Sequence, residues 1–251
     1  MVHTAIRANR PLALAGTRNT RELGGYATAD GKITRTHAFL RSDGLSRLTD
    51  ADLHKLLDYG VGCVVDLRSK KEILQAPSRL AEVPGVDYYE VHMLDQAASR
   101  NFAGDMPTHM GEVYVQLLAC HSREFAQVFR IFAAHRDVTV LFNCAAGKDR
   151  TGVTAMLLLL LAGVPEETVV ADYVPSENNM KELFALQRQQ LAQAGQPVPP
   201  MSVFSSAPEE IRMALDYLQQ HYAGAEDYLL QAGVSPAEIA AVRGMLLGRG
   251  E

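Results

Sequence analysis

The sequence predicts an α/β fold: a central, mainly parallel sheet flanked by helices, with a helical C-terminal third. Two short apolar runs, Val61 to Leu67 and Val138 to Phe142, have the length and composition of buried parallel strands. They alternate with segments of helical character, which is the element order of a parallel α/β unit. From Pro165 onward the predicted elements are all helices.

The composition excludes several classes of protein. The chain has 251 residues, of which 47% are hydrophobic and 21% charged, as in ordinary globular proteins. A net charge of −5 gives no global attraction to nucleic acid or to an anionic membrane. No apolar run reaches the ~20 residues of a membrane span, and we identify no signal peptide. We therefore expect one domain over residues 1–251, in the cytoplasm and without membrane insertion, and leave signal-independent export open.

The cysteine pattern predicts neither a disulfide framework nor a metal site. Cys63, Cys120 and Cys144 are an odd number and lack CxxC or zinc-ligand spacing. We expect no metal and no cofactor.

The first half of the chain predicts strands separated by turns and one clear helix. Its predicted elements are a hairpin turn at Asp30-Gly31, a short strand at Ala38 to Arg41, a helix capped by Thr49 or Asp50 that runs to Tyr59, and a strand at Val86 to Val91. The polar segment RSKKE, which follows the predicted strand Val61 to Leu67, is interpreted as a connection.

The second half predicts helices. The expected helices are Gly111 to His135, bent near His121, then Arg150 to Ala162, Glu166 to Tyr173, Glu177 to Ala194, Glu209 to His221, Glu226 to Ala232 and Pro236 to Leu247. The segment from Gly195 to Pro208 carries four prolines and breaks this series. We interpret Glu177 to Pro208 as a helical lid.

The segment that indicates chemistry lies between the strand ending at Phe142 and the helix beginning at Arg150. It reads NCAAGKDRTG, with Cys144 and Arg150 separated by five residues. A loop curled between a strand end and a helix N-terminus directs successive amide N–H groups into one concavity, which suits a tetrahedral oxyanion such as phosphate.

Each residue of this loop has a candidate role. Arg150 offers a planar clamp for two phosphate oxygens. The same positive field favours the thiolate of Cys144, a nucleophile for phosphorus. Amides from Ala145, Ala146, Gly147 and Lys148 onward would hold the oxygens, the Thr151 hydroxyl would ease departure of the thiolate, and Gly147 and Gly152 would keep the cradle open. The loop lacks the first glycine of a nucleotide-binding P-loop, which disfavours ATP hydrolysis.

The loop resembles the HCxxGxxR signature of the cysteine-based protein tyrosine phosphatases, and most closely their bacterial and fungal branch with HCxAGKDRTG. Further similarity lies at Asn19 to Tyr26 (NTRELGGY), at Arg41-Ser42-Asp43, and at Asp66 to Ser69 with Glu72. The resemblance covers nearly the whole chain. One position departs from the signature, because Asn143 stands where the family has His.

The resemblance implies a tyrosine phosphatase-like fold and a metal-independent phosphomonoesterase that acts on phosphotyrosine proteins or phosphoinositides. Inorganic phosphate would be the product. Two other classes stay open from the sequence. One is a phosphate-binding pseudophosphatase, suggested by Asn143. The other is a rhodanese-like sulfurtransferase, an interpretation that leaves the loop residues AGKDRTG unexplained.

Three side chains have competing interpretations. Asp149 is either the general acid for the leaving group, as the resemblance implies, or a helix cap. Asp66, at the carboxyl end of a predicted strand, is the rival for the acid and a candidate substrate-binding residue, or else pairs with Arg68 or Arg21. Lys148 either reaches a second phosphate of a polyanionic substrate or pairs with a carboxylate at the surface.

Overall fold

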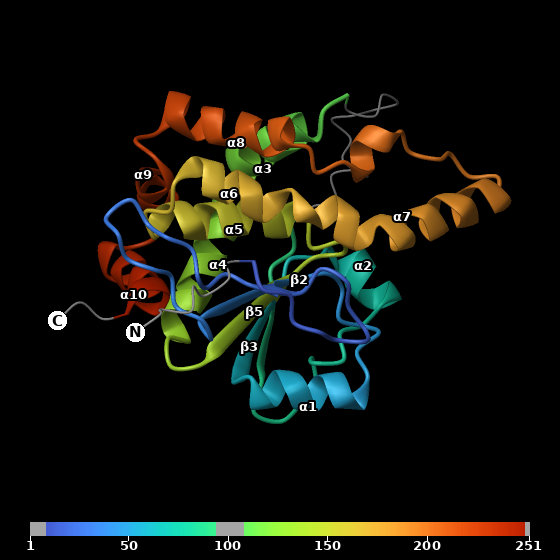
Figure 1. Cartoon of the computed structure of the whole chain (residues 1–251), viewed down its shortest axis with the longest axis horizontal. Helices are drawn as coiled ribbons and strands as arrows, with labels where there is room; N and C mark the ends of the chain where they lie inside the picture. Colours follow the sequence, from blue (N-terminus) through green and yellow to red (C-terminus); the bar gives the residue numbers. More distant parts are fainter. Residues whose placement is uncertain (1–8, 94–107, 249–251) are drawn as a thin grey trace, which may run out of the picture.

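A computed structural model describes residues 9–93 and 108–248 of the chain. Its centre is a five-stranded sheet in the order β1-β2-β5-β3-β4, and only the edge pair β1–β2 is antiparallel (Figure 1). The strands are β1 (Arg21–Glu22), β2 (Phe39–Ser42), β3 (Val61–Asp66), β4 (Asp87–Glu90) and β5 (Thr139–Asn143). The mainly parallel sheet predicted from the sequence is confirmed.

The two faces of the sheet bury different layers, because successive side chains of a strand point to opposite sides. Val140 and Phe142 of β5 join a large core with most of the helices, whereas Leu141 joins a smaller cluster with Leu56 of α1 (Asp50–Asp58). Among the helices of the described residues, α1 is the one that covers this face of the sheet (Figure 1). The helices of the larger layer are α3 (Met110–Cys120), α4 (Ser122–Ala134), α5 (Arg150–Leu161), α6 (Glu166–Tyr173), α8 (Pro208–His221), α9 (Ala225–Gln231) and α10 (Pro236–Leu247).

Local signals position most elements where the sequence predicts them. Thr49 caps α1 through a capping box with Asp52, and Gly60 follows the helix with φ +94°. The long helix expected to bend near His121 is two helices that meet at that residue.

Two expectations for the first half of the chain need correction. The RSKKE segment contributes to a helix, α2 (Lys70–Gln75), because Ser69 and Glu72 form a capping box at its start. The hairpin around Asp30-Gly31 reduces to one isolated bridge between Ala27 and Ile33.

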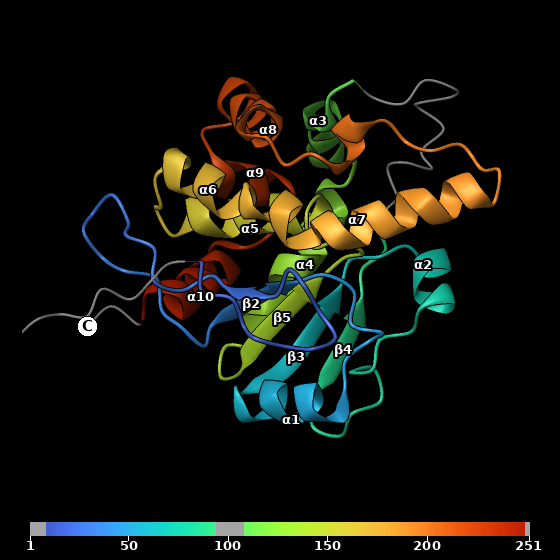
Figure 2. The ribbon, with the colours of Figure 1, turned by 45° about the vertical axis from the view of Figure 1, so that its right-hand side comes forward.

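The carboxyl ends of three parallel strands meet at one edge of the sheet. Asn143 lies in register with Ser42 on one side and with Asp66 on the other. The connections that follow these residues therefore converge, beneath α7 (Pro175–Gln193) and beside α2 (Figure 2). Within the described parts of the chain, no helix is long and apolar enough to cross a membrane.

Candidate active site

Cys144 follows β5 directly, and Arg150 begins α5, so the intervening loop joins a strand end to a helix N-terminus as the sequence predicts. The Cys144 residue is 1% exposed. Its thiol therefore lies at the base of the loop rather than on the surface.

The carbonyl groups of this loop are held from outside. The carbonyl of Ala145 accepts a hydrogen bond from the Gly44 amide at 3.0 Å. Asn19 Nδ2 donates to the carbonyls of Ala146 and Gly147 at 2.9 and 3.1 Å, and an Arg41 Nη donates to the latter at 2.8 Å. Because a peptide C=O and the following N–H point in opposite directions, the amides of residues 146–148 turn away from these partners.

The loop amides themselves are uncommitted. The N–H groups of residues 145–149 donate no hydrogen bond to any described part of the chain. Successive amides without a protein partner can all donate to one ligand, so this set of donors suits an anion. Gly147 has φ +65°, and a Cβ there would lie 2.6 Å from the Ser42 carbonyl oxygen, so this turn of the loop requires glycine.

A buried ion cluster supports the residues that hold the loop. Arg21 and Arg41 both pair with Asp172, whose side chain is 2% exposed. Burial disfavours its charge, yet the two arginines hold the pKa of Asp172 below its usual value. Asn19 is fixed by the Asp43 carboxylate, which accepts a hydrogen bond from the Asn19 backbone amide at 2.9 Å. The motifs around Asn19 and Arg41 thus act as scaffold for the loop.

Arg150 is oriented by a carboxylate on α2. Its two terminal nitrogens donate to Glu72 Oε2 and Oε1 at 2.7 and 2.8 Å. Burial would raise the pKa of Glu72, but Arg150 and Ser69 hold it at about 2. The bidentate pair fixes the plane of the guanidinium at the helix N-terminus.

Asp149 occupies the N-cap position of α5, but its side chain makes no cap hydrogen bond. Instead its Oδ1 accepts a hydrogen bond from the Tyr114 hydroxyl at 2.6 Å. The helix-cap interpretation of Asp149 is therefore wrong for the side chain.

Lys148 pairs with a neighbouring carboxylate, as one interpretation has it, because its Nζ lies 3.3 Å from Asp149 Oδ1, but it does so in the interior and not at the surface. The residue is 1% exposed, and its Nζ donates to the carbonyls of Val203 and Ser205 at 2.6 and 2.7 Å. An ammonium with two carbonyl acceptors is directed toward the segment around η3 (Met201–Phe204) and away from solvent. It ties the loop to that segment.

Asp66 is also placed differently from the expectation. It is fully buried at the end of β3, and its oxygens accept hydrogen bonds from Arg68 and from the Tyr88 hydroxyl. With both oxygens engaged, Asp66 does not face a substrate. It orients Arg68, as the ion-pair alternative stated.

The remaining predicted residues flank the loop in the sequence, Asn143 before Cys144 and Thr151 and Gly152 after Arg150. The Thr151 hydroxyl is buried and has no hydrogen-bond partner in the described residues. Asn143 Nδ2 donates to the Cys144 carbonyl at 3.4 Å, so it contacts the loop backbone. At Gly152 a Cβ would lie 3.2 Å from the Tyr173 ring, which favours glycine at this position.

A hollow of about 590 Å³ opens beside the loop. Ala145 lines it together with Glu72 and three arginines, Arg18, Arg47 and Arg68. This volume is typical of a small-molecule or side-chain pocket.

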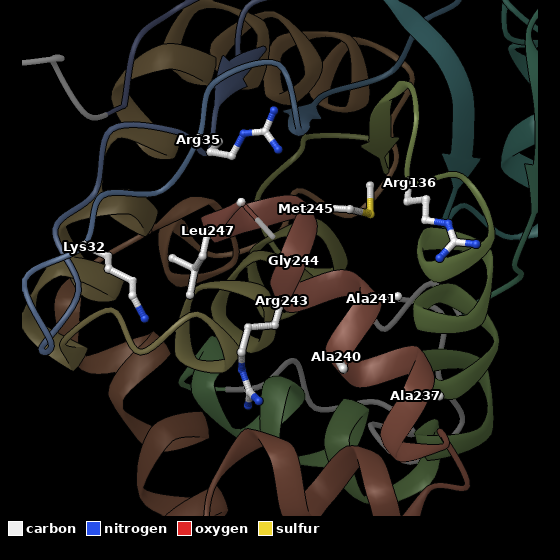
Figure 3. Close-up of a pocket in the computed structure, with 11 residues that line it drawn as sticks. Lys32, Arg35, Arg136, Ala237, Ala240, Ala241, Arg243, Gly244, Met245 and Leu247 are labelled. Carbon is white, nitrogen blue, oxygen red and sulfur yellow. The ribbon is translucent and has the colours of Figure 1, made fainter. Parts of the chain in front are cut away.

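A second hollow, of about 530 Å³, lies on α10 and is shown in Figure 3. Arg136, which precedes β5, lines it, so it sits at the amino end of that strand and not at the Cys144 end. Two of its other cations, Lys32 and Arg243, pair with Asp30 and Glu226. This surface is separate from the candidate active site.

Three contributors to the site have no signal in the sequence. Tyr114, Tyr173 and Asp172 look like residues of ordinary amphipathic helices, and their roles depend on contacts with distant segments. The unusual burial of Asp172 could have been found only from the fold.

Comparisons with known proteins show what the chain is similar to. Residues 12–248 match the model of a family described as the tyrosine phosphatase family. The chain is 37% identical over 210 residues to a tyrosine-protein phosphatase of Nostoc commune, covering 80% of this chain and 71% of that protein. It is 29% identical, over an alignment of 279 positions, to the triple specificity protein phosphatase PtpB of Mycobacterium tuberculosis. This alignment covers 94% of this chain and 98% of that protein. The crystal structure of P. aeruginosa TpbA aligns with a TM-score of 0.45 at 14% identity, over 91% of this chain and 99% of that chain.

Proposed function

Because the chain belongs to the tyrosine phosphatase family, we propose that it hydrolyses phosphotyrosine in proteins in two steps, through a phosphocysteine intermediate. The observation that carries the proposal is the set of uncommitted amides at residues 145–149, which directly follow a buried cysteine and end at an oriented arginine. Such donors hold the three equatorial oxygens of a phosphoryl group as it is transferred.

In the first step, the Cys144 thiolate attacks phosphorus and the bond from phosphorus to the tyrosine oxygen breaks. Asp149 donates its proton to the departing phenolate oxygen, so that neutral tyrosine leaves. Arg150, held in plane by Glu72, clamps the phosphoryl oxygens together with the loop amides.

In the second step, water attacks the phosphorus of phosphocysteine, and the Asp149 carboxylate takes a proton from that water. The bond from phosphorus to sulfur breaks, releasing inorganic phosphate and the thiolate. The Thr151 hydroxyl, which is buried beside the loop, donates a hydrogen bond to the thiolate as it leaves.

The hollow beside Ala145 receives the tyrosine ring and the adjoining peptide. Its arginines Arg18 and Arg47 favour peptides that carry acidic residues next to the phosphotyrosine.

The proposal is tested by turnover of a phosphotyrosine peptide. Cys144→Ser is expected to lower kcat at least about a thousandfold, about 4 kcal/mol of barrier, while vanadate binding is kept. Cys63→Ser is the matched control, because burial raises the pKa of the Cys63 thiol to about 12 and keeps it protonated in the core. Turnover by Cys144→Ser would contradict the mechanism, and vanadate binding by a parent enzyme without turnover would favour the pseudophosphatase.

We propose phosphoinositides as a second substrate class, on the observation that Arg47 is exposed beside the loop and has no ion pair among the described residues. A guanidinium there supplies a charge-assisted hydrogen bond to a second phosphate, worth about 1 to 3 kcal/mol. Arg47→Ala is expected to lower kcat/KM for a phosphorylated inositol at least about tenfold, 1.4 kcal/mol, and that for a phosphotyrosine monoester much less. Equal losses on both substrates would remove this second class.

We propose further that residues 177–208 act as a lid over the loop. Met180 and Phe184 of α7 cluster with Phe204 of η3 and with Ala146 of the loop. The Lys148 ammonium adds two hydrogen bonds to the same segment. Beyond these contacts α7 extends past α2 in both views (Figures 1 and 2), and its Leu186 is 47% exposed.

A further inference from the structure

We propose that Tyr114, itself held by Tyr173, is a positioning residue that anchors one oxygen of Asp149 and leaves the other to present its proton to the leaving group. This inference rests on the role of Asp149 as the acid in the proposed function. It assigns a purpose to two buried hydroxyl groups that the mechanism above does not use.

The geometry is a chain of two short hydrogen bonds. The Tyr114 hydroxyl lies 2.6 Å from Asp149 Oδ1 and 2.6 Å from the Tyr173 hydroxyl. The two rings meet edge to face, with centroids 5.9 Å apart. Tyr114 comes from α3 and Tyr173 from α6, and the two residues are 0% and 1% exposed. The loop aspartate is therefore fixed by two helices of the core.

The number of available protons decides which group donates in each of these two hydrogen bonds. An ionised carboxylate only accepts hydrogen bonds, and a tyrosine hydroxyl has a single proton to donate. Since Tyr114 uses its proton toward Asp149, its oxygen accepts the proton of Tyr173. Burial, followed by the charge of Asp149, raises the pKa of Tyr114 well above its ordinary value. Tyr114 therefore stays a donor at every assay pH.

The two oxygens of Asp149 have different surroundings. Oδ1 accepts from Tyr114 and lies 3.3 Å from Lys148 Nζ. Oδ2 accepts no hydrogen bond from the described residues, and the side chain keeps 24% of its surface exposed. With Oδ1 occupied by donors, the transferable proton resides on Oδ2, whose direction is set by the anchor on Oδ1.

The test compares aryl phosphates with poor and with activated leaving groups. Tyr114→Phe keeps the ring and removes the donor, so kcat for poor leaving groups is expected to fall about tenfold, with KM unchanged and activated esters little affected. Tyr173→Phe is expected to shift the same ratio in the same direction by less, because Tyr114 then still donates to Asp149. In an Asp149→Asn background, Tyr114→Phe is expected to have no further effect on the ratio.

Tyr228→Phe is the matched control. Its buried hydroxyl donates to the Leu118 carbonyl at 2.9 Å, so the change removes a comparable hydrogen bond that does not contact Asp149. It is expected to lower stability without altering the leaving-group ratio. A Tyr114→Phe effect that is uniform across leaving groups, or equalled by Tyr228→Phe, would overturn the positioning role alone. Asp149→Asn without any leaving-group dependence would overturn the acid assignment, and this inference with it.

Discussion

Two buried cysteines show how surroundings decide reactivity at the scale of a residue. Cys63 lies inside β3 among apolar side chains, where burial favours the neutral thiol. Cys144 is equally buried, but it follows the end of β5 and begins the loop of uncommitted amides. Donors of this kind stabilise a thiolate, and for this reason the proposed mechanism assigns the attack on phosphorus to Cys144 and not to Cys63.

Glu22 carries the clearest pH dependence of stability. Burial raises its pKa to about 7, although a hydrogen bond from the His37 amide acts in the opposite direction. A carboxyl group with a raised folded pKa contributes its full stability below the unfolded value of 4.5 and loses it as pH rises through 7. Glu22→Gln removes this titration. Between pH 5 and pH 8 the parent is expected to lose about 2.5 kcal/mol more of its free energy of unfolding than the variant, as measured by urea denaturation.

Glu238→Gln is the control for that measurement. Glu238 caps α10, and its hydrogen bonds with Ser235 lower its pKa. Its contribution to the free energy of unfolding is therefore lost only at acid pH. Glu238→Gln is expected to leave the change in that free energy between pH 5 and pH 8 as it is in the parent. Parallel pH curves for the parent and Glu22→Gln would contradict the account of Glu22.

At the scale of an element, the segment from α7 to η3 gives a prediction for the lid. Lys148→Met keeps an apolar stem but removes the two hydrogen bonds to Val203 and Ser205. The segment is then expected to open more often, and peroxide is expected to inactivate Cys144 several-fold faster, because access limits oxidation of a buried thiolate. The measurement is the inactivation rate at fixed peroxide concentration.

Lys181→Met is the control for this rate, because Lys181 lies on α7 and contacts neither the loop nor η3 through any described hydrogen bond. It is expected to inactivate at the parent rate. A Lys148→Met protein that is folded and inactivates no faster than the parent would reject the lid.

The elements that could be predicted from the sequence are those whose signals are local. The apolar runs of β3 and β5 and the caps of α1 and α10 are readable within a few residues. The two-residue strand β1 could not be predicted, because it exists only through pairing with β2, which lies about 20 residues away in the chain. The same limit applies to the site. Cys144 and Arg150 are readable from one loop, whereas Tyr114 reaches Asp149 across 35 positions.

At the scale of the whole molecule, the fold gathers distant scaffold residues around one loop. Asn19 and Arg41 hold its carbonyls, and Glu72 orients Arg150. Asp172 in turn pairs with Arg21 and Arg41. Removing one partner from such a buried ion cluster leaves an uncompensated charge. The geometry of the loop is thus a property of the complete sheet and its helices.

The central claim is that the chain transfers a phosphoryl group to Cys144, and trapping that intermediate tests it most directly. In Asp149→Asn with an activated aryl phosphate, attack by the thiolate needs little acid help, while hydrolysis lacks its base, so phosphocysteine is expected to accumulate. Intact mass after an acid quench should show one added phosphoryl group, peptide mapping should place it on Cys144, and the Cys144→Ser protein should show none. Steady turnover with no phosphoryl group on Cys144, or with the group on another residue, would contradict the account.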